Sequence, residues 1–86
     1  MKYTIKYKKS VEKDLRKLSQ KDRSAVVRKI VSLGETPRPA YSIKLKGSVN
    51  LYRLRHGAYR IIYQIFDTTV MVVVVKVGHR KDVYKP

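Results

Sequence analysis

The spacing of apolar residues near the start of the chain predicts one strand followed by two helices. Tyr3, Ile5 and Tyr7 alternate with polar residues, which places them on one face of an extended segment over residues 2–7. The step then changes to three and four residues, which is the period of an α-helix. The two helical sets are Val11, Leu15 and Leu18, and then Val26, Val27, Ile30 and Leu33. We therefore expect two antiparallel helices joined by a tight turn.

Serine and glycine residues indicate where these helices begin and end. Ser10 is expected to cap the first helix and Ser19 the second, because a serine hydroxyl accepts a hydrogen bond from the open N–H groups of a first turn. Asp22 lies three residues after Ser19, where a carboxylate is favourable at the positive end of a helix. Gly34 is placed to end the second helix.

The rest of the chain predicts strands. Pro37 and Pro39 make an extended connector, after which residues 43–45 can pair briefly as an edge strand. Further strands are expected at residues 51–55, 59–66 and 70–77. The short turns between them indicate an antiparallel meander. The last run is almost wholly apolar, which is typical of a central strand covered on both faces.

The order of these elements, β-α-α-β-β-β, predicts a single α+β domain over residues 1–86. We expect an antiparallel sheet of about four strands, with the two helices packed as an antiparallel hairpin on one face. Arg53 and Arg55 share one face of their strand, and Arg60 lies on the next strand. A suitable register would bring the three arginines together on the face away from the helices, although the alternation alone does not determine that register.

The charge of the chain points to a polyanionic partner. Twenty-one Lys and Arg stand against six Asp and Glu, which gives a formal net charge of +15. Residues 36–66 contain no acid, and their cations are Arg38, Lys44, Lys46, Arg53, Arg55 and Arg60. Nucleic acid would relieve the mutual repulsion of these charges. The alternative is a solvated charged surface that only keeps the chain soluble.

The composition also excludes several kinds of site. Without cysteine, the chain has no disulfide, thiol nucleophile or thiolate metal site, which fits a reducing cytoplasm. His56 and His79 are the two histidines, and no acid lies between Glu35 and Asp67, so we expect neither a metal nor another cofactor. We also expect no signal peptide and no membrane contact, because the longest apolar run is too short to cross a bilayer.

Binding, or metal-free chemistry on a phosphodiester, remains. RNA carries its own nucleophile, the 2′-hydroxyl, beside each phosphorus atom. A protein that aligns this hydroxyl and surrounds the phosphate with arginines can cleave RNA without a cofactor. It also needs an acid for the departing 5′-oxygen and a base for the 2′-hydroxyl.

Two blocks in the second half of the chain resemble the RelE/ParE superfamily of bacterial and archaeal toxins. The blocks read LYRLRHGAYRIIY over residues 51–63 and VGHRKDVY over residues 77–84. The KLKG of residues 44–47 and the spacing of Leu15 and Leu18 fit the same family. The resemblance extends over essentially the whole chain and implies a β-α-α-β-β-β fold. It also implies a toxin of a type II toxin–antitoxin system: RelE-type members cleave mRNA in the ribosomal A site, whereas ParE-type members inhibit DNA gyrase by binding.

The resemblance assigns the phosphate-binding residues of a RelE-type site. Arg53 and Arg55 match basic positions ahead of the Gly-x-Tyr-Arg block, and Arg60 matches the arginine that holds the scissile phosphate. Lys44 and Lys46, with Arg53 and Arg55, are expected to bind RNA. These matches favour a metal-independent, ribosome-dependent mRNA interferase. Two other interpretations stay open, namely a solvated strand face for Arg53 and Arg55 and a structural ion pair for Arg60.

The resemblance leaves the general base open. Arg80 matches an arginine that assists the leaving group, and Tyr84 matches a tyrosine that aligns or deprotonates the 2′-hydroxyl. The best-studied family pattern has lysines where Arg53 and Arg55 stand, and arginine is a poor base because it stays protonated. His79 and Tyr84 are therefore both candidates for proton removal. Alternatively, His79 caps a turn and Tyr84 packs a terminal segment.

The resemblance and the charge together imply the partners. We expect a cognate RelB-like antitoxin whose acidic, amphipathic segment wraps the toxin, together with the ribosome and mRNA. The free toxin is expected to be a monomer that becomes heteromeric with the antitoxin. A gyrase-binding toxin without nuclease activity and a nuclease-dead RNA-binding module are the alternatives.

Overall fold

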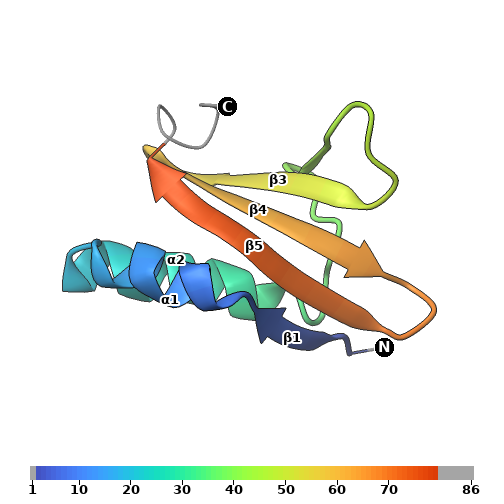
Figure 1. Ribbon diagram of the computed structural model, residues 1–86, viewed down its shortest axis with the longest axis horizontal. Helices are drawn as coiled ribbons and strands as arrows, with labels where there is room; N and C mark the ends of the chain where they lie inside the picture. Colours follow the sequence, from blue (N-terminus) through green and yellow to red (C-terminus); the bar gives the residue numbers. More distant parts are fainter. Residues whose placement is uncertain (1, 80–86) are drawn as a thin grey trace.

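The computed structural model describes residues 2–79, which form one five-stranded sheet and two helices. The elements are β1 (Thr4–Tyr7), α1 (Lys9–Arg16), α2 (Gln20–Ser32), β2 (Ile43–Lys44), β3 (Leu51–His56), β4 (Tyr59–Phe66) and β5 (Met71–His79). The strands lie in the order β1-β5-β4-β3-β2, and Figure 1 shows β3, β4 and β5 above the two helices. The predicted α+β class and element order are confirmed, and the short edge strand is the fifth member of the sheet.

The sheet is mixed, which departs from the expected antiparallel arrangement. The β3, β4 and β5 strands form the predicted antiparallel meander. However, β1 pairs with β5 in the parallel direction, with Thr4 opposite Met71 and Tyr7 opposite Val74. The alternation within β1 determines which side chains share a face, but it carries no information about the neighbouring strand or its direction.

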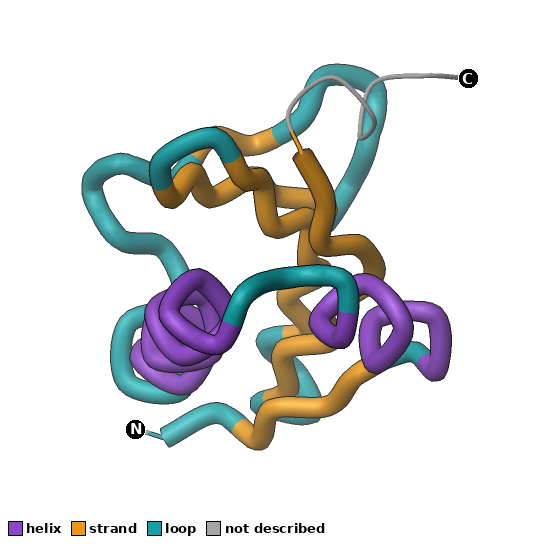
Figure 2. Tube along the Cα trace, turned by 90° about the vertical axis from the view of Figure 1, so that its left-hand side faces the viewer, coloured by secondary structure: helices purple, strands orange, loops and turns teal. Residues whose placement is uncertain are grey.

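The core lies between the sheet and the helices. Its buried members are Val11, Leu18, Val26, Ile30, Leu33, Leu54, Ile61, Tyr63, Ile65, Val72, Val74 and Val77. Figure 2 looks nearly along α2, at the left, with the turn that joins the two helices nearest the viewer. The apolar stripes predicted from the sequence therefore face the sheet. As predicted, β5 is an internal strand, between β1 and β4, but the expected cover on both faces is wrong. Val72 and Val74 are buried against the helices, whereas Val73 and Val75 are only half-buried because both helices lie on the other side of the sheet.

The two helix starts show where local capping determines the structure and where it does not. Ser19 caps α2 as predicted, because its side chain accepts a hydrogen bond of 3.1 Å from the Asp22 N–H. The predicted Ser10 cap is wrong: α1 begins after Lys8, which has no side-chain cap. The Lys8 N–H donates to the Val74 carbonyl oxygen at 3.0 Å, so the sheet fixes the residue at which the chain can turn into the helix.

Gly34 follows the end of α2, as predicted, but its role is close packing. A Cβ atom at this position would lie 3.2 Å from the Tyr3 carbonyl oxygen and 3.3 Å from that of Val31. In return, the Tyr3 N–H donates to the Gly34 carbonyl oxygen at 2.7 Å. The glycine thus lets the chain ahead of β1 lie against the end of α2. Neither helix in residues 2–79 is long and apolar enough to span a membrane.

Candidate active site

The β3–β4 hairpin brings three arginines to one face of the sheet. Arg55 pairs directly with Arg60, and Arg53 pairs with Ile62. Paired residues of antiparallel strands point to the same side, so the three arginine side chains share a face. Leu54 and Ile61, which alternate with them, are buried in the core beneath. The arginines therefore lie on the face away from the helices, in one of the registers that the sequence allows.

The three guanidinium groups differ in how deeply they lie. Arg60 is 8% exposed, Arg53 is half-buried and Arg55 is exposed. Like charges directly opposite each other on neighbouring strands destabilise a sheet, typically by a few tenths of a kcal/mol up to about 1 kcal/mol. An anion bound over Arg55 and Arg60 would interact favourably with both charges. The arrangement therefore suits a phosphate that is held by the nearly buried Arg60. The exposed side chain of Arg55 can change its conformation to reach the same phosphate.

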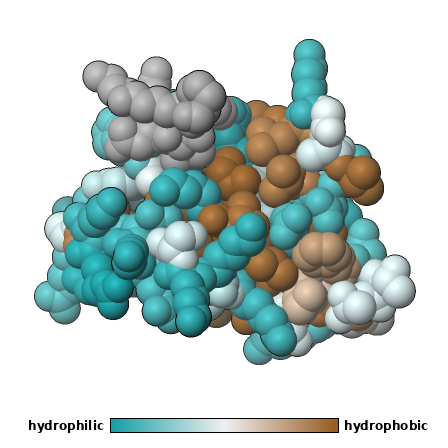
Figure 3. All heavy atoms as spheres, in the orientation of Figure 1, coloured by the Kyte–Doolittle hydropathy of each residue, from teal (hydrophilic) through white to brown (hydrophobic). Residues whose placement is uncertain are grey.

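Beyond the arginines, the same face is mostly apolar, with Gln64 among its apolar residues. Ile62 follows Arg60 on this face of β4, with Phe66 farther along, and Met71 and Val73 lie beside them on β5. Figure 3 shows hydrophobic residues gathered in a band across the middle of the molecule, between hydrophilic residues. The face thus combines a basic end with an apolar end, which suits an amphipathic partner as well as a phosphate.

The expected RNA-binding lysines lie apart from the arginines. Lys44 of β2 pairs with Tyr52, so it points to the side opposite Arg53. Lys46 lies in the turn after β2, and both lysines are exposed. The structure does not bring them onto the arginine face, although they extend the positive surface around that edge of the sheet.

The remaining predicted catalytic residues lie at or beyond the end of β5. His79 pairs with Tyr59 and therefore lies on the helix side of the sheet, opposite the arginines. The rings of Tyr59 and His79 meet edge to face, with centroids 6.0 Å apart. Arg80 and Tyr84 lie outside the described residues.

Asp14 is a nearly buried polar residue whose role the sequence pattern does not indicate. It is 9% exposed, and its carboxylate accepts hydrogen bonds from the Val77 N–H and the Lys76 ammonium group, both at 3.2 Å. Because β1 pairs with β5 only as far as Val74, the next part of the β5 edge is open, and Asp14 of α1 covers it. The signal in the sequence was an acid on the apolar stripe of α1, three residues after Val11.

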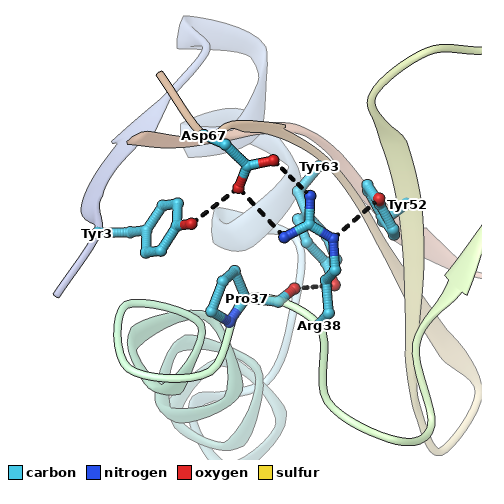
Figure 4. Close-up of polar contacts among 6 residues, drawn as sticks. All are labelled: Tyr3, Pro37, Arg38, Tyr52, Tyr63 and Asp67. Carbon is cyan, nitrogen blue, oxygen red and sulfur yellow. Dashed lines mark hydrogen bonds and ion pairs between the residues drawn. The ribbon is translucent and has the colours of Figure 1, made fainter. Parts of the chain in front are cut away.

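Arg38 has a structural role in this fold. Its guanidinium donates to both carboxylate oxygens of Asp67, at 2.8 and 3.2 Å, and to the Tyr52 hydroxyl at 3.0 Å (Figure 4). The Tyr3 hydroxyl donates to the same carboxylate at 2.8 Å. These hydrogen bonds, that from Arg38 above all, hold the pKa of Asp67 below its ordinary value. Arg38 thus ties the connector to the β4–β5 turn.

A second contact fixes the same connector. The Tyr63 hydroxyl donates to the Pro37 carbonyl oxygen at 2.8 Å, and the Tyr63 ring stacks on Tyr52 with centroids 5.9 Å apart. Burial raises the pKa of Tyr63, so the hydroxyl remains a donor. Tyr52 and Tyr63 therefore serve the packing of the connector.

No group of His, Asp or Glu within residues 2–79 has the arrangement of a metal site. What the arginine face offers is positive charge and hydrogen-bond donors. Such a set can bind a phosphate and stabilise additional negative charge on it.

Comparison with known proteins identifies the family. Residues 5–84 match the family model described as "ParE toxin of type II toxin-antitoxin system, parDE". The chain is 35% identical over 83 residues to the mRNA interferase toxin RelE of Escherichia coli K12, covering 94% of this chain and 86% of that one. It is 31% identical over 91 residues to the toxin RelG of Mycobacterium tuberculosis, covering 99% of each chain.

The solved structures agree with these sequence relatives. A chain of the archaeal RelE–RelB complex from Pyrococcus horikoshii matches with a TM-score of 0.84 and 30% identity, covering 95% of this chain and 99% of that one. The family match and the fold lead to one conclusion: the chain belongs to the ParE toxin family of type II toxin–antitoxin systems, within the RelE/ParE superfamily.

Proposed function

We propose that this chain is an endoribonuclease toxin that cleaves mRNA on the ribosome, in the cytoplasm, and thereby inhibits translation. The observation that carries the proposal is the β3–β4 register, which sets Arg53, Arg55 and Arg60 on one face of the sheet. The family match and the RelE relatives support the class of activity. The basic surface supports binding to RNA, since the chain has a net charge of +15.

The reaction is a transesterification within the RNA. The 2′-oxygen attacks the adjacent phosphorus, the bond from phosphorus to the 5′-oxygen breaks, and the products are a 2′,3′-cyclic phosphate and a 5′-hydroxyl. The proton of the 2′-hydroxyl passes to a base, and the departing 5′-oxygen receives a proton from an acid. The chemistry needs no metal, because the nucleophile belongs to the substrate and the charge on phosphorus is met by cations of the protein.

The arginines divide this work according to their burial. Arg60, which is nearly buried, is the ordered donor to the phosphate, and its interaction strengthens as negative charge develops on the phosphate oxygens. Arg53 and Arg55 clamp the RNA backbone from the neighbouring strand. Through the family resemblance, Tyr84 takes the role of base and Arg80 assists the leaving group.

The inhibiting partner is a RelB-like antitoxin. A segment that is acidic and amphipathic complements both ends of the arginine face, since its carboxylates would meet the arginines and its apolar side would cover the half-buried Phe66 and Val73. Solved relatives include RelE–RelB complexes. The toxin is a monomer until it forms this complex.

A second candidate function follows from the family model itself, which is named for ParE. ParE-type inhibition of DNA gyrase would use the chain as a binding protein. Three arginines on one face of the β3–β4 hairpin favour the first candidate, because they supply the positive charge and the donors that a phosphate undergoing cleavage needs.

Two parallel assays separate the candidates. In a cell-free translation reaction, primer extension on the translated mRNA should show toxin-dependent stops within codons, and an untranslated copy of the same mRNA should show far fewer. In a supercoiling assay, the same toxin preparation should leave gyrase active. Gyrase inhibition with intact mRNA would establish the second candidate in place of the first.

A further inference from the structure

A hollow lies between the end of α1 and the end of β5, on the opposite side of the sheet from the three arginines. Its volume is about 340 Å³, and its lining includes Lys17, Tyr59, Lys76 and His79. This volume falls within the range typical of small-molecule sites, about 300–1,000 Å³. None of the functions described above uses this hollow as a binding site.

The lining suits one nucleotide unit. Tyr59 and His79 supply two aromatic rings, and Leu18 and Val77 supply apolar walls, which together favour a flat base. Lys17 is an exposed residue at the end of α1, where its ammonium group can reach a phosphate.

Asp14 determines how such a nucleotide would enter. Its nearly buried carboxylate lines the hollow and accepts from Lys76 and Val77, so the ammonium group of Lys76 is already paired and the carboxylate itself disfavours a phosphate beside it. The phosphate is therefore directed to the rim beside Lys17, and the base to the interior beside Tyr59.

The hollow is also next to the proposed cleavage site. Tyr59 and Arg60 are consecutive residues of β4, with Cα atoms about 3.8 Å apart. Successive side chains of a strand point to opposite faces, so Arg60 faces the phosphate site while Tyr59 faces the hollow. An RNA strand that bends over this end of the sheet can meet both.

We propose that the hollow between α1 and β5 is a subsite for one nucleotide of single-stranded RNA adjacent to the scissile phosphate, with the base against Tyr59 and His79 and the phosphate at Lys17. This inference rests on the proposed ribonuclease function. In it, His79 is a binding residue for the flanking nucleotide, and it takes no part in proton transfer.

Nucleotide binding to the full-length toxin, labelled with nitrogen-15, tests the proposal without any cleavage. The probes are the four nucleoside 5′-monophosphates, the matching nucleosides and inorganic phosphate. We expect saturable shifts of the Tyr59, Val77 and Gly78 amide signals with the monophosphates. The same shifts should appear at higher concentration with the nucleosides, and inorganic phosphate should not reproduce them.

Matched variants assign the binding to the hollow. Tyr59→Phe keeps the ring and should bind within about threefold of the original chain, whereas Tyr59→Leu should bind at least tenfold more weakly. Lys17→Ala, at an exposed position that should not disturb folding, should weaken binding of the monophosphates several-fold and leave the nucleosides unchanged. The Lys17 variant keeps the test decisive even where Tyr59→Leu fails to fold.

Three results would overturn the subsite: shifts confined to the arginine face, equal binding by Tyr59→Leu, or the same shifts with inorganic phosphate alone. These results are distinct from a failure of the proposed function. If the toxin cleaves mRNA but the hollow binds no nucleotide, only the proposed subsite is refuted. If the hollow binds nucleotides but the toxin leaves mRNA intact, the proposed ribonuclease function is refuted. The hollow then has no role in binding the RNA substrate.

Discussion

Arg55 and Arg60 lie directly opposite each other on β3 and β4, with Arg60 only 8% exposed and Arg55 open to solvent. Two positive charges that face each other on neighbouring strands, with guanidinium donors on the same side of the sheet, form a suitable site for an anion. The proposed scissile phosphate is that anion. The relationship makes Arg60 the residue on which cleavage should depend most.

Replacing Arg60 with alanine should abolish cleavage while the fold is retained. Loss of one donor to a developing negative charge costs about 10²–10³ in rate, or about 3–4 kcal/mol. Primer extension in a translation reaction measures the rate, and circular dichroism reports the fold. Arg28→Ala, which removes an exposed charge from α2, is the matched control and should cleave normally. A folded Arg60→Ala toxin with near-normal cleavage would refute the assignment.

The base should be Tyr84, because the structure sets His79 on the helix side of the sheet, away from the arginines. Tyr84→Phe removes only the hydroxyl and should lower the single-turnover cleavage rate with little effect on ribosome binding. His79→Gln should keep most of that rate and act chiefly on RNA affinity. The opposite pattern, a fully active Tyr84→Phe and an inactive His79→Gln, would exchange the two roles.

The Asp67 carboxylate should make stability depend on pH in the acid range. Its pKa is lowered in the folded chain, chiefly by the hydrogen bond from Arg38, so its contribution is complete above the unfolded value of 3.8 and is lost as pH falls through the folded pKa. Urea unfolding should therefore show Asp67→Asn less stable than the original chain at pH 7. The difference should shrink at pH values below 3.8. A difference that stays constant with pH would show that the carboxylate charge is irrelevant.

Val70 should be a site at which stability can be raised. This β-branched residue has a positive φ of 52° in the turn before β5, where its carbonyl oxygen accepts from the Thr4 N–H at 3.0 Å. Glycine relieves such strain, so Val70→Gly should gain about 0.5–1 kcal/mol in the free energy of unfolding. Val49→Gly, at an exposed loop valine without positive φ, should show no gain. Equal effects of the two substitutions would exclude backbone strain as the cause.

Much of the fold could be predicted because it depends on periodicity. The alternation in residues 51–66 predicts the hairpin that carries Arg53, Arg55 and Arg60, and the Ser19 cap is a local interaction that the sequence shows directly. The start of α1 could not be predicted, because the hydrogen bond between Lys8 and Val74 joins residues that are distant in the chain.

The site was harder to predict than the fold. The side of the sheet on which His79 lies depends on the residue that it pairs with in the neighbouring strand. The pairing with Tyr59 places it on the helix side, away from the arginines. The role of Asp14 cannot be predicted from the sequence, because it depends on the edge of β5 lying beside α1, where the Val77 N–H donates to the carboxylate. Side chains that share a face follow from the sequence, whereas side chains that share a cavity follow from the pairing of distant segments.

The chemistry of the new RNA ends tests the central claim most directly. Fragments produced by the toxin during translation should be sequenced at both ends, with the Arg60→Ala toxin in a parallel reaction. Attack by the 2′-hydroxyl predicts a 2′,3′-cyclic phosphate on the upstream fragment and a 5′-hydroxyl on the downstream fragment, both absent with Arg60→Ala. A 3′-hydroxyl with a 5′-phosphate would mean that water was the nucleophile and would contradict the account.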